Sequence, residues 1–145
     1  MRYVVLIGRI LFSAIFVTAI INHFMPMTIS YANQAGVPIA RALVPISGII
    51  AGLGGLSILL GFRARIGAWL IVLFLVPVTL TMHNFWAVSD PMMRGMQLAN
   101  FMKNLSMLGA ALLISYFGTG PLSLDDRSSG ERRRSGAGAM ESHAA

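Results

Sequence analysis

The sequence contains no cysteine and few charged residues. The absence of cysteine from its 145 residues excludes disulfides, cysteine-ligated zinc, iron–sulfur clusters and thiol redox relays. Charged residues make up 11% of the chain and hydrophobic residues 56%. An average soluble domain is about one quarter charged. So little charge cannot cover the surface of a soluble domain, and the composition therefore indicates a membrane protein.

Acidic residues are especially scarce in the apolar part of the chain. Residues 1–124 carry seven basic residues and one acid, Asp90, whereas the charges of residues 125–145 balance. The whole net charge of +6 therefore lies at the edges of the apolar segments and within them. This distribution is typical of the positive-inside rule and does not form a continuous basic face, so we expect no nucleic-acid partner.

Four apolar segments of about 20 residues can each cross a bilayer as a helix. We expect an all-α fold, an integral membrane four-helix bundle over residues 1–124. Its helices are predicted at about 4–23, 40–60, 64–83 and 98–117. A short helix is predicted near residues 28–35 of the first loop. Residues 125–145 are rich in serine, glycine and arginine, and we predict a disordered cytoplasmic tail there.

The loop charges predict the orientation of the bundle. With four spans, both termini and the second loop share one side of the membrane. That side carries seven arginines and the other side two. Both termini are therefore expected to face the cytoplasm, in a multi-pass protein of the bacterial cytoplasmic (inner) membrane that is surrounded by lipid.

Several short segments occur in a familiar order. They are Gly8-Arg9-Ile10-Leu11-Phe12-Ser13, Gly61-Phe62-Arg63-Ala64-Arg65, Met82-His83-Asn84-Phe85-Trp86 and Gln97-Leu98-Ala99-Asn100-Phe101-Met102-Lys103-Asn104, followed by Gly118-Thr119-Gly120-Pro121. In this order they resemble the DoxX family of small four-helix bacterial membrane proteins. The resemblance implies a membrane subunit of a redox assembly, linked to quinones or to oxidative stress, with other membrane or redox subunits as partners.

Polar and aromatic side chains gather near the predicted external ends of the helices. The first and third helices run outward and the fourth returns, so these side chains are expected to meet at one level. Amide donors, an imidazole and aromatic walls suit a quinone headgroup, which is the cofactor this site would take. The alternative is that they anchor helices at the interface and hydrogen-bond between helices. The candidate residues are His23, His83, Asn84, Trp86, Asn100, Lys103 and Asn104.

Three further positions in the apolar segments have a predicted role. Arg9 lies inside the first helix, where it either extends back to the interface or faces the interior as a polar anchor for a carbonyl, a quinone oxygen or a lipid phosphate. Gly48 and Gly52 form a small-xxx-small pair that serves helix packing, within the bundle or between copies in a homo-oligomer.

Two alternatives to a quinone-linked subunit stay open. The first is a non-catalytic accessory or structural subunit of a larger membrane complex; in either role a complete stand-alone enzyme is not expected. The second is an external copper site, because thioethers and imidazoles are soft ligands for Cu(I), although their spacing matches no strict metal motif. The residues of that metal site would be His23, Met25, Met27, Met82 and His83.

Overall fold

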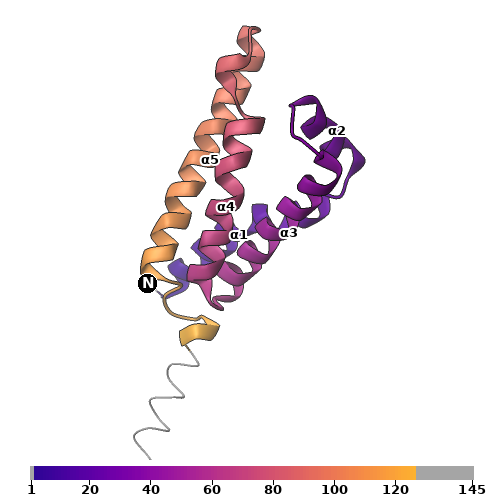
Figure 1. Ribbon diagram of the computed structural model, residues 1–145. Coiled ribbons are helices and arrows are strands. Elements are labelled where there is room, and N and C mark those ends of the chain that lie inside the picture. Colours follow the sequence, from indigo (N-terminus) through magenta and orange to yellow (C-terminus); the bar gives the residue numbers. More distant parts are fainter. Residues whose placement is uncertain (1, 127–145) are drawn as a thin grey trace, which may run out of the picture.

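The computed structural model describes residues 2–126 of the protein as a set of helices (Figure 1). In chain order they are α1 (Arg2–Asn22), α2 (Pro26–Gln34), α3 (Ala40–Leu60), α4 (Ala64–Met82), the 3-10 helix η1 (Phe85–Ala87) and α5 (Pro91–Phe117). Within residues 2–126 there is no strand, and four helices are long and apolar enough to cross a membrane. The predicted all-α membrane fold is therefore confirmed.

The long helices pack in the order α1, α3, α4, α5. Glycines of α3 allow the close approach on both sides. A Cβ added at Gly55 would lie 2.9 Å from the Cβ of Phe16 in α1, and one added at Gly54 would lie 2.8 Å from the backbone oxygen of Gly67 in α4. The core between these helices includes Phe16, Ile58, Ile71 and Leu75, each no more than 2% exposed. Helix α3 is thus the centre of the packing, and α5 lies at its edge.

Gly48 and Gly52 both face α1. A Cβ at Gly48 would meet the side chain of His23, and one at Gly52 would meet the side chain of Ile20. Both glycines are buried within this one chain. Their place in the fold is therefore the α1–α3 contact inside the chain.

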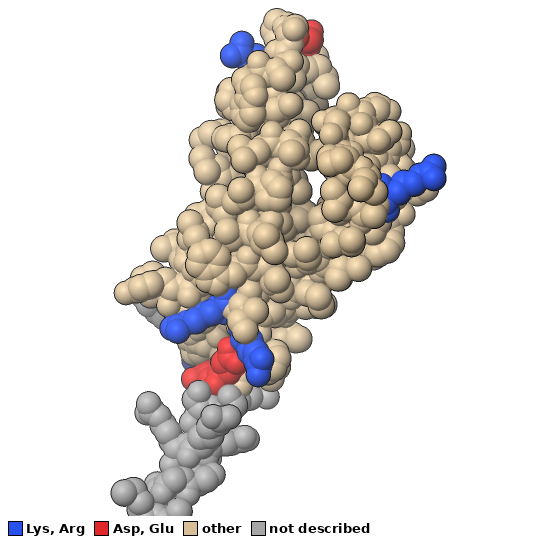
Figure 2. Space-filling model, viewed as in Figure 1, with Lys and Arg blue, Asp and Glu red and all other residues tan. Residues whose placement is uncertain are grey.

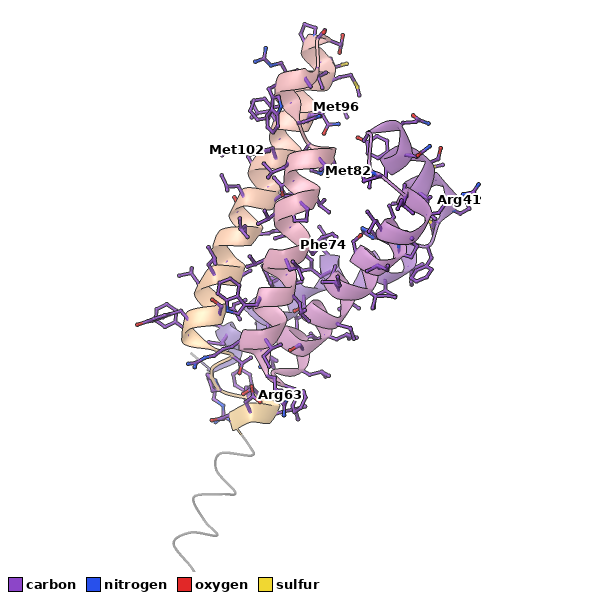
Figure 3. All side chains as sticks on the ribbon, viewed as in Figure 1. Arg41, Arg63, Phe74, Met82, Met96 and Met102 are labelled. Atoms are coloured by element: carbon purple, nitrogen blue, oxygen red, sulfur yellow. The ribbon has the colours of Figure 1, made fainter. Side chains whose placement is uncertain are left out.

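The two ends of the molecule differ (Figure 1). At the terminal end, which holds the start of α1, the α3–α4 turn and the end of α5, the helices lie close together. At the opposite end, called the α2 end below, they diverge into two arms. One arm consists of α2 with the first part of α3, and the other of α4 with α5. Phe74 lies where the arms separate, and Met82 lies further along the α4 arm (Figure 3).

Helix α5 begins at Pro91, earlier than the apolar segment that starts at Leu98. Asp90 is its N-cap, and the Asp90 carboxylate accepts a hydrogen bond of 2.8 Å from the Met93 backbone N–H. Proline at the first helical position suits this start because its missing N–H would have no partner there. The first turns of α5 are polar enough to fall outside a hydropathy window, which explains the difference from the predicted start.

The first loop and the C-terminal region complete the fold. The short helix predicted near residues 28–35 is α2, which begins at Pro26 and ends at Gln34. Asp125 and Asp126 of the predicted tail lie in a helical turn at the terminal end. The rest of the predicted tail, residues 127–145, lies outside the described residues.

Candidate functional site

Three side chains form a hydrogen-bonded bridge between the two arms at the α2 end. His83 Nδ1 lies 2.8 Å from Gln97 Oε1, and Gln97 Nε2 donates to the Tyr31 hydroxyl oxygen over 3.0 Å. His83 follows the end of α4, Gln97 lies in the second turn of α5, and Tyr31 lies in α2. We call these three residues the arm bridge.

The order of donors in the arm bridge follows from the Gln97 amide. Its nitrogen donates to Tyr31, so its oxygen accepts from His83, and His83 carries a proton on Nδ1. The Nε2 atom of a neutral His83 is then an acceptor. The Tyr31 hydroxyl accepts from Gln97, so its own proton can be donated to a further acceptor. Tyr31 is 46% exposed, which leaves that proton accessible.

An opening separates the two arms (Figure 2). Phe74 lies at its base and Met82 higher on the α4 side (Figure 3). Met82 packs across the opening against the apolar cluster of Ala32 and Val44. The ring of His23 packs on Phe74, with the ring centroids 5.6 Å apart. The space between the arms is therefore apolar below and polar at the arm bridge.

The structure does not place His23 beside His83. Phe74, the ring partner of His23, is nine residues before His83, so it lies about 13 Å lower along α4. His23 Nδ1 is engaged 2.8 Å from the Ala19 carbonyl oxygen of its own helix. The expected convergence of both histidines at one level fails because the first arm diverges from the second above Phe74.

Asn84 and Trp86 belong to a separate aromatic cluster. Trp86 lies 5.1 Å from Phe85 and 5.9 Å from Phe101, between ring centroids. The Asn84 carbonyl oxygen accepts a hydrogen bond of 2.9 Å from the Ala87 backbone N–H and so starts η1. These two residues therefore hold η1 against α5 rather than taking part in the arm bridge.

The polar residues of α5 point in different directions. The Lys103 ammonium donates to the Asn100 carboxamide oxygen over 3.1 Å, and Lys103 is an exposed residue. Asn104 is 5% exposed and lies at helical spacing from the buried Ala111, on the face towards α4. Lys103 and Asn104 therefore cannot contact the same small ligand from inside the bundle.

The residues of the alternative copper site are spread over the α2 end. Met27 is 84% exposed, Met25 is 47% exposed, and Met82 packs into the apolar cluster described above. Among residues 2–126, no group of three or more histidine, aspartate or glutamate side chains could hold a metal ion. Met82 is thus engaged in apolar packing, whereas Met25 and Met27 are exposed side chains.

Arg9 is buried, and its guanidinium reaches the terminal end of the bundle, beside Gly61 and Leu122. It is 4% exposed, and its Nη2 donates a hydrogen bond of 2.6 Å to the Leu122 carbonyl oxygen. Of the predicted partners for Arg9, a carbonyl is the one this chain itself provides.

The sequence does not indicate that Tyr31 pairs with Gln97. The predicted start of the fourth helix at about residue 98 leaves Gln97 at its edge, whereas the structure places Gln97 in the second turn of α5. A signal was present in Asp90-Pro91, which is a typical start of a helix and brings Gln97 into its second turn.

Comparison with known proteins identifies the family. The model of the SURF4 family matches residues 1–129. The chain is 30% identical over 100 residues to the inner membrane protein YphA of Escherichia coli, covering 69% of this chain and 71% of YphA. It is 32% identical over 123 residues to the inner membrane protein YqjF of the same organism, covering 83% of this chain and 88% of YqjF.

No solved structure matches the chain. The resemblance to the DoxX family is wrong, because the family model that matches across all of the described residues is a different one. The predicted bacterial inner membrane location agrees with that of both relatives. The chain is an integral inner membrane protein and belongs to the SURF4 family.

Proposed function

We propose that the protein binds an amphipathic small molecule between its two arms, with a carbonyl headgroup at the arm bridge and an apolar tail in the opening below. A membrane quinone belongs to this chemical class. The observation that carries the proposal is the free hydroxyl proton of Tyr31 beside the His83–Gln97 pair. The proposal concerns binding alone, since the redox role was implied by the DoxX resemblance.

The headgroup chemistry follows from the donors and acceptors of the arm bridge. A carbonyl oxygen accepts the Tyr31 proton, and a hydroxyl group can donate to His83 Nε2. A ligand with both groups, such as a partly reduced or hydroxylated ring, would bridge Tyr31 and His83. Each of these hydrogen bonds contributes about 1 kcal/mol, which is enough to orient a ligand that the membrane already concentrates.

The apolar part of the ligand has a matching path. The opening between the arms has Phe74 at its base and Met82 on the α4 side (Figure 3), and Met82 packs against Ala32 and Val44 of the other arm. These side chains offer contact to an isoprenoid or alkyl chain without a polar cost. The opening lies between helices that cross the membrane, so the tail can enter from the surrounding lipid.

Tryptophan fluorescence tests this proposal. The chain has two tryptophans, and Trp86 contacts Phe101, which lies one turn of α5 beyond Gln97. In a Trp69→Phe background, titration with decylubiquinone in nanodiscs is expected to give saturable quenching of Trp86. Tyr31→Phe is expected to raise the dissociation constant about fivefold to tenfold, because it removes both the hydroxyl donor to the ligand and the acceptor of the Gln97 amide.

The matched control is Tyr116→Phe, the same change on an exposed tyrosine at the terminal end. This variant should give the same dissociation constant for decylubiquinone as the Trp69→Phe parent. Quenching that rises linearly with the quinone in the lipid phase, with equal slopes for Tyr31→Phe and Tyr116→Phe, would mean that the quinone only partitions into the bilayer and would refute the proposed site.

A second candidate function is that of an accessory subunit that packs through α5. Lys103 supports it, because it is an exposed ammonium near the middle of a helix of 27 residues. A charge at that depth favours a partner helix with a carboxylate opposite. Helix α5 also carries Gly95 and Gly109, and an added Cβ would meet nothing within 4 Å at either position. Small residues there would let such a helix approach closely.

Blue native electrophoresis of solubilised membranes tests the accessory role. The wild-type chain is expected to migrate in a complex larger than the purified chain, and Lys103→Met should release it. Lys103→Arg keeps the charge and should keep the complex. Equal migration of all three proteins at the position of the purified chain would exclude this role.

A further inference from the structure

Arg9 is a buried cation whose hydrogen-bonding capacity is largely unused. A guanidinium has five N–H donors. In the described residues, its Nη2 atom donates to the Leu122 carbonyl oxygen, while Nε and Nη1 are buried without a partner. Ser13, one turn further along the same face of α1, is completely buried and its hydroxyl oxygen also lacks a partner. Two buried polar side chains, one helical turn apart on α1, thus have unsatisfied groups.

The helices that enclose Arg9 supply no acidic side chain to it. Helices α1 and α3 have no aspartate or glutamate. Gly61, at the end of α3, leaves the space that the Arg9 guanidinium fills, since a Cβ there would meet both Arg9 Nη1 and Ser123. Leaving a buried guanidinium with unpaired N–H groups costs free energy unless an acceptor of opposite charge is supplied. No carboxylate of α1 or α3 supplies that acceptor, and the Asp125 carboxylate of the C-terminal turn is engaged by the Arg63 backbone N–H.

The C-terminal turn, residues 118–126, covers this site. Three hydrogen bonds are among the contacts that hold it to the bundle. The Leu122 carbonyl oxygen accepts from Arg9, the Asp125 backbone N–H donates to the Gly61 carbonyl oxygen over 3.0 Å, and the Asp125 carboxylate accepts from the Arg63 backbone N–H over 3.1 Å. Leu122 has a φ of +60°, a left-handed conformation that costs a non-glycine residue free energy. The cover is therefore strained at Leu122.

A hollow of about 630 Å³ lies on the other side of the cover, lined by Arg63 and Arg65 of the α3–α4 turn and by Ser123, Asp125 and Asp126 of the C-terminal turn, whose two carboxylates would leave with the turn if it were displaced. Charged side chains of both signs gather at this end of the molecule (Figure 2), and Arg63 projects there (Figure 3). Ser123 belongs to the hollow and also lies against Gly61, next to Arg9. Displacing the C-terminal turn would join the hollow to Arg9 and bring three arginines into one space.

We infer that Arg9 and Ser13 form a binding site for a phosphate group and that the C-terminal turn is its displaceable cover. A phosphate oxygen would replace the Leu122 carbonyl, the remaining oxygens would accept from Nε and Nη1, and the Ser13 hydroxyl would donate to one of them. Arginine pairs with phosphate through two parallel hydrogen bonds, which a single carbonyl cannot match. The site does not depend on the arm bridge at the other end of the molecule.

The depth of Arg9 agrees with a headgroup ligand. It lies seven residues after Arg2, so it is about 10 Å along α1 from the start of the helix. Phosphate at this level is supplied either by an anionic phospholipid of the leaflet at the terminal end or by free phosphate from the adjoining solution. Basic pockets between membrane helices commonly take lipid headgroups.

Native mass spectrometry of the purified full chain distinguishes the two sources. With equal amounts of phosphatidylglycerol and phosphatidylcholine in the detergent micelle, the protein is expected to retain phosphatidylglycerol at least about tenfold better, as expected for a charge-assisted bidentate contact. Inorganic phosphate at excess is the second arm. Loss of the lipid adduct on adding phosphate, with appearance of a phosphate adduct, identifies free phosphate as the ligand.

Variants test whether Arg9 carries the binding. Arg9→Gln and Ser13→Ala should each lower retention, whereas Arg41→Gln, the same charge change on an exposed arginine at the α2 end, should not. Leu122→Val tests the cover, because a β-branched residue is strained further in the left-handed region and should raise retention about threefold. A misfolded protein would lose lipid retention, so an increase in retention cannot result from misfolding. Equal retention by wild type, Arg9→Gln and Leu122→Val, or no adduct in either arm, would overturn the inference.

Discussion

The Gly54→Val variant is expected to lose about 3 kcal/mol of unfolding free energy, at the upper end of the cost of overpacking a core. An added Cβ at position 54 lies 2.8 Å from the Gly67 carbonyl oxygen and 2.9 Å from Ile71 Cδ1. The first of these atoms belongs to the α4 backbone, so no side-chain rotation can relieve the contact. Helices α3 and α4 must move apart, and Ile58, Ile71 and Leu75 lose their close packing.

This loss is measured by titrating the purified protein with SDS and following the far-ultraviolet circular dichroism or a label at the α3–α4 contact. Gly109→Val is the matched control, because the same substitution in α5 meets nothing within 4 Å. It should leave the unfolding midpoint close to that of the parent. A Gly54→Val protein that unfolds at the same SDS fraction as Gly109→Val would show that α3 and α4 do not pack through this glycine pair.

The sequence predicts the helices well because each is set by local chemistry. Apolar length defines α1, α3 and α4, and Gly61 ends α3 in a left-handed conformation at a φ of +66°. The start of α5 was missed for an equally local reason. The polar turns from Pro91 to Gln97 depend on the Asp90 cap, and a search for apolar residues passes over them.

The arrangement of the site depends on crossing angles, which the sequence does not state directly. His23 and His83 both follow long helices, and simple alternation would put them at one level. The close α1–α3 packing at Gly48 and Gly52 instead directs the end of α1 into the α2 arm, away from α4. The arm bridge then joins Tyr31 to Gln97 across 66 positions of the chain. Such a pair is set by the fold as a whole.

The partner of Arg9 could not be predicted from the sequence either. An arginine inside an apolar helix needs an acceptor, but its partner Leu122 is 113 positions away and offers a backbone carbonyl, so no side-chain pattern indicates it.

The family could not be read from short segments of the sequence. Segments such as Gly8-Arg9-Ile10 and Gly118-Thr119-Gly120-Pro121 are typical of helix ends and helix packing in small membrane bundles. Segments of this kind do not separate one family of four-helix proteins from another, which is why the DoxX resemblance was misleading.

Gly61 connects the end of α3 to both Arg9 and the C-terminal turn, so Gly61→Ala is expected to open the cover. Alanine at a φ of +66° is strained by about 1–2 kcal/mol, and its methyl group would meet Arg9 Nη1 and the Ser123 side chain. The backbone at this position also accepts the hydrogen bond from the Asp125 N–H. The strain is relieved most easily by moving the turn, because the helices on the other sides are packed.

Thiol labelling measures the opening, since the chain has no cysteine of its own and Ser123→Cys introduces a single buried reporter, 2% exposed in the parent residue. Gly61→Ala should raise the labelling rate of this reporter by a maleimide at least about tenfold, the factor that corresponds to 1.4 kcal/mol of opening free energy. Gly36→Ala imposes the same kind of strain, at a φ of +82° with nothing within 4 Å, but at the α2 end. Its labelling rate should equal that of Ser123→Cys alone. A rate unchanged by Gly61→Ala, or raised equally by Gly36→Ala, would mean that Gly61 does not hold the cover closed over Arg9.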